Sequence, residues 1–110
     1  MATRQDTALR ALDAVIEASI SARQALRQSE TMLRRLRRGI EKGSPVTEAF
    51  AGLGIAENRQ NTFDHLAALE RVRRDARRAL IELGVSQGLS LGHMAREWGV
   101  SRQLVARIAK

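Results

Sequence analysis

The sequence predicts an all-α protein: a long antiparallel helical hairpin, expected to dimerise, followed by a C-terminal helix-turn-helix. Ala, Leu, Arg and Glu are abundant, whereas β-branched and aromatic residues are few, and this composition favours helices over strands. Apolar residues recur at helical spacing along two long stretches, which predicts the hairpin. Near the end of the chain, two short amphipathic patterns flank the tripeptide Gly-Val-Ser at residues 99–101, which predicts two short helices and a turn.

The first long helix is expected within residues 1–43. No Gly or Pro occurs between Asp6 and Arg38, and apolar residues recur there at alternating steps of three and four. One row consists of Ala8, Ala11, Val15, Ala18, Ala22 and Ala25. Beside it runs a second row of Leu9, Leu12, Ile16, Ile20 and Leu26. The alanine row would let another helix approach closely, and a helix roughly 50 Å long requires a long partner.

A short helical corner is expected at residues 44–56. Gly39 and Gly43 are helix terminators that close the first helix. Ser44 and Pro45 follow, and this pair predicts an N-cap with proline at the first helical position of a short helix. The corner would turn the chain back on itself and start the second arm of the hairpin.

The second long helix is expected at residues 57–88. Its apolar stripe consists of Phe63, Leu66, Leu69, Val72, Ala76, Ala79 or Leu80, and Leu83. The sequence leaves open whether Gly84 or Gly88 ends this helix, because one glycine inside a helix costs only about 1 kcal/mol relative to alanine.

The two long helices carry more apolar surface than one hairpin can bury. Exposed apolar patches usually mark association, so we expect a homodimer formed through the long helices. The alternative is that the C-terminal unit folds back and covers the spare surface. Which helix forms the dimer interface stays open at this point.

Residues 89–110 predict two short helices that pack on the end of the second long helix. Ser90 would cap a helix over residues 91–98, Gly99 would end it at positive φ, and Ser101 would cap the next helix. The residues expected to form the core of this unit are Ala95, Trp98, Gly99, Val100, Val105 and Ile108. Two short helices joined by a three-residue turn that contains a glycine constitute a helix-turn-helix.

Residues 90–110 resemble the helix-turn-helix of bacterial DNA-binding proteins, in the Gly-Val-Ser-Arg form found in many repressors and in the resolvase and invertase group. The matching positions are Ala95, Gly99, Val100, Val105 and Ile108, and Ser101-Arg102 matches the opening of the recognition helix. The resemblance implies binding of double-stranded DNA, with the helix at residues 101–110 in the major groove. The rest of the chain resembles nothing specific.

In this motif the first residues of the second helix reach base edges, and neighbouring side chains hold the phosphates. The residues expected to contact bases are Arg102, Gln103 and Ala106. The residues expected to contact phosphates are Ser90, Arg96, Ser101, Arg107 and Lys110, together with Arg73 and Arg77 of the second long helix. A symmetric dimer would read a pseudo-palindromic site, so a transcriptional regulator is expected.

Charge and composition favour the same class of partner. The formal net charge is +7, and nearly all of the positive charge is arginine, whose planar fork suits phosphate. The absence of cysteine excludes disulfides and thiolate chemistry. No catalytic constellation, phosphate loop or metal-ligand spacing is evident, so we expect a protein that is not an enzyme and needs no metal or cofactor.

Two other functions remain open on the sequence. One is a helical assembly or adaptor protein whose long hairpin binds a partner protein. The other is a non-specific architectural DNA-binding protein. No stretch is long and apolar enough to span a bilayer, and the first residues lack a signal-peptide core. We therefore expect no membrane association and a cytoplasmic location, on the nucleoid when DNA is bound.

Overall fold

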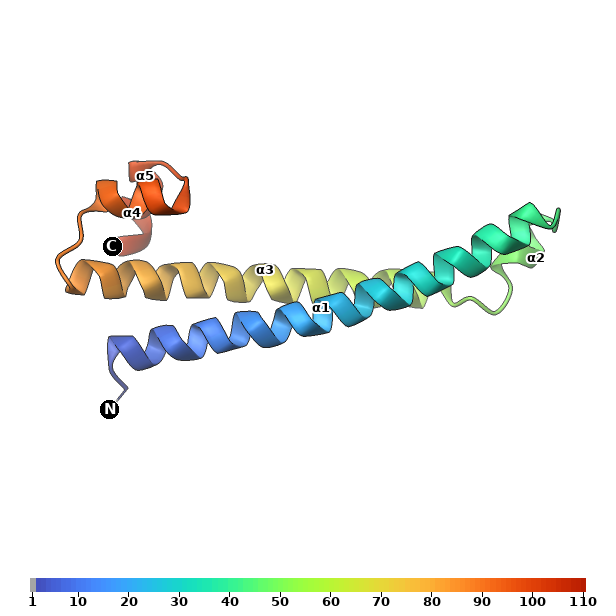
Figure 1. Cartoon of the computed structure of the whole chain (residues 1–110), viewed down its shortest axis with the longest axis horizontal. Coiled ribbons are helices and arrows are strands. Elements are labelled where there is room, and N and C mark those ends of the chain that lie inside the picture. Colours follow the sequence, from blue (N-terminus) through green and yellow to red (C-terminus); the bar gives the residue numbers. More distant parts are fainter. Residues whose placement is uncertain (1) are drawn as a thin grey trace. The chain divides into compact units, whose positions relative to one another are not determined.

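The computed structural model describes residues 2–110, and every regular element in this part of the chain is an α-helix. The helices are α1 (Arg4–Glu41), α2 (Val46–Phe50), α3 (Ile55–Ser86), α4 (Leu91–Trp98) and α5 (Arg102–Ala109) (Figure 1). The long helices α1 and α3 run antiparallel and are connected through α2. The prediction of an all-α fold with a long helical hairpin is confirmed.

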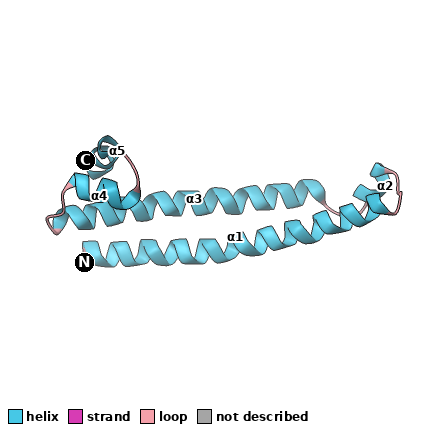
Figure 2. Cartoon of the chain, turned by 45° about the horizontal axis from the view of Figure 1, so that its top comes forward, coloured by secondary structure: helices cyan, strands magenta, loops and turns pink. Residues whose placement is uncertain are grey.

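The fold consists of two compact units. The first contains residues 2–16 and 70–110, and the second is Glu17–Leu69. In each unit a segment of α1 lies beside a segment of α3 (Figure 2). The first unit also contains α4 and α5, whereas the second also contains α2. The candidate helix-turn-helix therefore shares its unit with the start of α1 and the second half of α3.

α1 begins with a reciprocal cap between Thr3 and Asp6. The backbone N–H of Asp6 donates to Thr3 Oγ1 at 3.0 Å, and the backbone N–H of Thr3 donates to Asp6 Oδ2 at 3.1 Å. The first turn of a helix leaves N–H groups without partners, and a capping box of this kind satisfies two of them. Hydrogen bonding to Thr3 holds the pKa of Asp6 below its usual value. The backbone of Thr3 has the larger effect and its side chain the smaller one.

Small side chains line the faces on which α1 and α3 lie side by side. In the first unit, Ala8 of α1 is buried, as are Ala76 and Ala79 of α3. In the second unit, Ala22 and Ala25 of α1 are buried. Because alanine adds little bulk to a helix surface, these positions let the two helices pack closely. The row of alanines in the sequence predicted this contact.

A polar cluster joins α1 to α3 in the second unit. Ser29 Oγ donates to Asn58 Oδ1 at 2.7 Å and lies 2.8 Å from Thr62 Oγ1. The three side chains are partly buried, and they satisfy one another within the helix contact. The sequence did not predict this cluster, because polar residues at these positions look the same as residues that face solvent.

The start of α2 differs from the prediction. Ser44 does not cap α2: Pro45 occupies the N-cap position with φ −56° and ψ 146°, and no side chain caps this helix. The extended ψ of Pro45 moves the helix start to Val46.

The end of α3, which the sequence left open, lies before Gly88. The helix continues through Gly84. Gly88 has φ 88°, and its N–H donates to the carbonyl of Val85 at 3.0 Å. Of the two glycines, Gly88 is therefore the terminator.

Candidate nucleic-acid interface

Two serines start the short helices α4 and α5. Ser90 Oγ accepts a hydrogen bond from the backbone N–H of His93, and Ser101 Oγ accepts one from the backbone N–H of Leu104, both at 3.1 Å. Each serine has extended backbone angles, as an N-cap residue requires. Both predicted caps are confirmed, and they locate the start of each helix from local sequence alone.

A glycine and a valine form the turn between the two helices. Gly99 has φ 65° and ψ 34°, in the left-handed region that favours glycine. Its N–H donates to the carbonyl of Arg96 at 3.3 Å, and the N–H of Val100 donates to the carbonyl of Ala95 at 3.0 Å. This pair of bonds is a Schellman motif, in which the apolar residue after the glycine packs back on the helix. The predicted turn is confirmed.

A small buried cluster holds α4 and α5 on α3. Its centre consists of Ile81 of α3, Met94 and Ala95 of α4, and Val105 of α5. Ile81 and Val105 have no exposed surface. The partly buried side chains packed around this centre are Leu91, Val100, Ile108 and Ala109. Ala95, Val100, Val105 and Ile108 therefore occupy the core positions expected of them, and Ile81 and Met94 complete the cluster.

Glycine at position 84 permits the close approach of Met94 to α3. A Cβ built on Gly84 would lie 2.7 Å from Met94 Sδ and 3.4 Å from Leu89 Cδ1. Gly84 is buried within α3, where glycine is otherwise unfavourable for a helix. The sequence left Gly84 as a possible helix end, but its place in the structure is explained by this contact.

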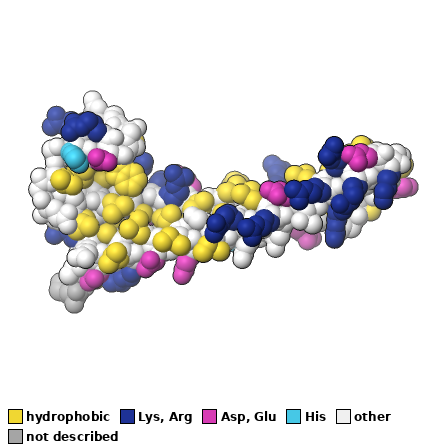
Figure 3. All heavy atoms as spheres, viewed as in Figure 1, with side chains coloured by type: hydrophobic (Ala, Val, Ile, Leu, Met, Phe, Trp, Pro, Cys, Tyr) yellow, Lys and Arg dark blue, Asp and Glu magenta, His cyan; other side chains and the backbone are white. Residues whose placement is uncertain are grey.

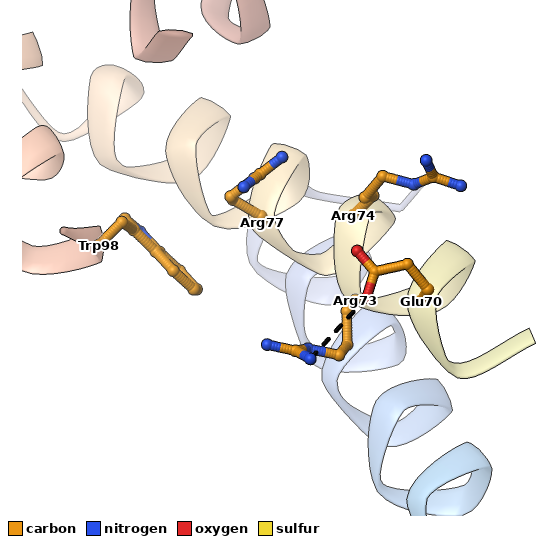
Figure 4. A pocket seen from close by; sticks show the side chains of 5 residues that line it. All are labelled: Glu70, Arg73, Arg74, Arg77 and Trp98. Atoms are coloured by element: carbon orange, nitrogen blue, oxygen red, sulfur yellow. Dashed lines mark ion pairs between the residues drawn. The ribbon is translucent and has the colours of Figure 1, made fainter. Parts of the chain in front are cut away.

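Trp98 is not part of the core, and the prediction that it would be was wrong. Its exposed fraction is 43%. Trp98 follows Met94 by one turn on the same side of α4, beyond the end of the buried cluster. There it lines a hollow together with Arg73 and Arg77 of α3 and two of their neighbours (Figure 4).

The residues expected to contact DNA are distributed over α3, α4, α5 and the caps of the two short helices. Those that are exposed are Ser90, Arg96, Ser101, Arg102, Gln103, Arg107, Lys110 and Arg73. Ala106 and Arg77 are half-buried. At the start of α5, exposed Arg102 and Gln103 directly follow the cap, while Val105 on the same helix is buried. The helix thus has one face fixed to the protein and one face available to a partner.

Most of the cations around α4 and α5 have no ionic partner. Within residues 2–110, Arg96, Arg102 and Arg107 form no ion pair. His93 Nε2 lies 3.7 Å from Glu97 Oε1, a contact that is ionic only when the imidazole is protonated. Residues 90–110 carry four positive groups and one carboxylate, a net charge of +3. An anionic partner would therefore meet cations that the protein itself does not neutralise.

Across 2–110, no group of three or more His, Asp and Glu side chains has an arrangement that could hold a metal ion. None of the helices described for this chain combines the length and the apolar character needed to cross a bilayer.

In comparisons with protein-family models, curated proteins and solved structures, nothing matches this chain. The caps, the turn, the buried cluster and the charges of α3, α4 and α5 are therefore the observations that bear on its function.

Proposed function

We propose that the protein is a dimeric, sequence-specific double-stranded DNA-binding protein that regulates transcription, with α5 in the major groove. The observation that carries the proposal is the α4–turn–α5 unit, in which two capped helices close over a small core and leave Arg102 and Gln103 exposed. In a helix-turn-helix the second helix presents its first residues to base edges. A protein with this role works in the cytoplasm, on the nucleoid.

The first turn of α5 has side chains suited to reading bases. The guanidinium of Arg102 matches O6 and N7 of guanine, and the amide of Gln103 matches N6 and N7 of adenine. Ala106 lies one turn further along α5 and offers a methyl group to the methyl of thymine. Each good pairing of this kind discriminates against the wrong base by about 1–3 kcal/mol.

Phosphate contacts would set the position of the duplex. The proposed donors on the caps, α4 and α5 are Ser90, Arg96, Ser101, Arg107 and Lys110, and those on α3 are Arg73 and Arg77. Contacts of this kind orient a protein on DNA without reading sequence. They also make the affinity depend on salt, since each neutralised phosphate releases counterions.

Dimerisation is assigned to an apolar stripe on the first half of α1. The stripe consists of Leu9, Leu12, Ile16 and Ile20, with exposed fractions of 53, 38, 59 and 43%. At about 100° per residue, it lies roughly a third of the way round α1 from the buried face that contains Ala22. Hydrophobic side chains gather over the α1 and α3 segments of the first unit in Figure 3. In the first unit, α4 and α5 cover Ile81 of α3, whereas Leu9, Leu12 and Ile16 of α1 stay exposed.

The dimer is tested by placing a charge on the stripe. Ile16→Glu is expected to give a monomer in sedimentation equilibrium at micromolar concentration, because a carboxylate would be buried without a partner in the interface. Leu33→Glu is the matched control, since Leu33 is also on α1 and lies outside the stripe. Its exposed fraction of 53% is close to the 59% of Ile16. A dimer that survives Ile16→Glu, or one that only Leu33→Glu dissociates, would contradict this assignment.

DNA binding is tested by fluorescence anisotropy with duplexes that share length and differ in sequence. The affinity is expected to fall by roughly 10³-fold between 50 and 200 mM salt if about six phosphates are contacted. Arg102→Ala is expected to reduce the ratio between the best and the poorest duplex. Arg107→Ala is expected to weaken all duplexes by a similar factor. An unchanged ratio in Arg102→Ala would show that α5 does not read bases as proposed.

One observation favours a second candidate, a helical adaptor that binds a partner protein. A hollow of about 370 Å³ in the second unit is lined by residues of α1 and α3. Phe63 at its rim is 65% exposed, and Leu33 and Leu66 are exposed beside it. A salt-insensitive protein complex that Phe63→Ser abolishes, together with equal affinity for all duplexes, would favour this function over the first.

A further inference from the structure

A hollow in the first unit brings three arginines of α3 together with the single tryptophan of the chain. Its volume is about 160 Å³, and Glu70, Arg73, Arg74, Arg77 and Trp98 line it. Figure 4 shows the indole of Trp98 extending from α4 toward the helix that carries the arginines. All five residues belong to the same unit. The exposure of Trp98, which the core does not explain, thus coincides with a basic hollow.

The charge of this hollow is not balanced by the protein. The residues that line it carry three guanidinium groups and one carboxylate, Glu70, whose Oε2 lies 3.8 Å from Arg73 Nη1. Both side chains of that pair are more than half exposed, so the pair contributes little. Within residues 2–110, neither Arg74 nor Arg77 forms an ion pair. The hollow therefore keeps a net positive charge.

Arg77 also has a donor that nothing in the described residues satisfies. Its Nε is buried from solvent and has no hydrogen-bond partner. A buried donor without an acceptor costs free energy, and such groups are rare unless a ligand or water completes them. A stacking contact between the indole and a guanidinium would account for the position of Trp98, but it would leave this N–H without an acceptor.

We propose that this hollow binds one phosphate group. Guanidinium forks donate paired hydrogen bonds to phosphate oxygens, and Arg73, Arg74 and Arg77 all line this hollow. The volume of about 160 Å³ is below the range of about 300–1,000 Å³ typical of larger ligands, so the hollow suits a small group. The flat face of Trp98 provides an apolar wall for the carbon atoms that carry the phosphate.

The favoured source of the phosphate is the DNA backbone, and this part of the inference rests on the proposed function. Trp98 is the last residue of α4, and Ser101, the cap of α5, is only three residues further along the chain. A phosphate held against Trp98 would therefore fix the duplex close to the start of the reading helix. A free phosphate ester has the same chemistry and is the other source that the experiment must distinguish.

The test uses the fluorescence of Trp98, which reports on this hollow alone because the chain has no other tryptophan. The full-length protein is titrated with inorganic phosphate at constant ionic strength, with chloride as the reference anion. A saturable change in emission is expected with phosphate and not with chloride. Arg77→Gln is expected to weaken phosphate binding about tenfold or more, since hydrogen bonds to a charged group are lost. Arg78→Gln, on α3 and outside the hollow, is the matched control and should titrate like the wild type.

If Arg77→Gln has unchanged circular dichroism and still responds to phosphate as the wild type does, the site is overturned. An equal response of the wild type to chloride would overturn it too. Titration with a short duplex in the presence of phosphate then identifies the source. Competition between duplex and phosphate supports the DNA backbone as the source, whereas simultaneous binding supports a free phosphate ester and contradicts the DNA backbone as the source. Saturable phosphate binding by a protein without any duplex affinity would leave the site standing and refute the proposed function.

Discussion

Replacing Gly84 by alanine tests whether α4 docks on α3 as described. Alanine is more favourable than glycine in a helix by about 1 kcal/mol, so helix propensity alone predicts a more stable protein. The new Cβ would, however, lie 2.7 Å from Met94 Sδ, well inside the separation of about 3.5–4.0 Å at which non-bonded heavy atoms attract. Overpacking of this kind costs about 1–3 kcal/mol. Gly84→Ala is therefore expected to lower the free energy of unfolding by up to about 2 kcal/mol.

Gly92→Ala is the matched control for this substitution. Gly92 also lies inside a helix, α4, and its new Cβ would have Arg96 Nη1 at 3.7 Å as its nearest neighbour, an ordinary contact. It should stabilise the protein by about 1 kcal/mol. Because the propensity gain is common to both variants, their difference of about 1–3 kcal/mol isolates the contact with Met94.

The assay is denaturant unfolding followed by Trp98 fluorescence at one fixed protein concentration, since a dimer makes stability depend on concentration. A double-mutant cycle with Met94→Ala isolates the contact. Met94→Ala should lower the unfolding free energy less in the Gly84→Ala background than in the wild type. If Gly84→Ala stabilised the protein as much as Gly92→Ala, the close approach of Met94 to α3 would be refuted.

Three further predictions concern the turn and the caps. Gly99→Ala should lower the unfolding free energy by about 1–2 kcal/mol in chemical denaturation, because alanine resists the left-handed φ of 65°; no loss would mean that the turn differs from the one described. Ser101→Ala should cost about 1 kcal/mol and speed amide exchange at the Leu104 N–H, which loses its acceptor; unchanged exchange would contradict the cap. Hydrogen bonding to Thr3 lowers the pKa of Asp6. The cap therefore stabilises α1 at pH values above the ordinary pKa of an aspartate, and this stabilisation is lost as the pH falls through the lowered pKa. An NMR titration should place the midpoint of Asp6 below that of aspartate in an unfolded peptide, about 3.9, and an equal or higher midpoint would count against the cap.

Features set by neighbouring residues could be predicted from the sequence. The long helices follow from composition and spacing, and the turn after α4 follows from Ser90, Gly99 and Ser101, because a cap or a left-handed residue acts within three or four positions of itself. Local rules were incomplete at Pro45, where the extended backbone of the proline itself took the N-cap position expected of Ser44.

Features set by the docking of one helix on another could not be predicted in the same way. Trp98 was expected in the core, but the cluster on α3 ends one turn earlier along α4, at Met94. The contribution of Ile81 and the reason for Gly84 depend on the same docking geometry, which no local pattern specifies. The basic hollow beside Trp98 is a further consequence, since it exists only where the end of α4 meets the arginines of α3.

Selection of duplexes from a random library by the purified protein, at about 0.15 M salt, shows directly whether α5 reads a DNA sequence. Arg102→Ala is carried through the same selection. We predict that the wild type enriches a two-fold symmetric sequence and that Arg102→Ala loses preference at particular base pairs of each half-site while still retaining duplexes. Enrichment of duplexes without a shared sequence, or of none at all, would contradict the claim that α5 reads DNA.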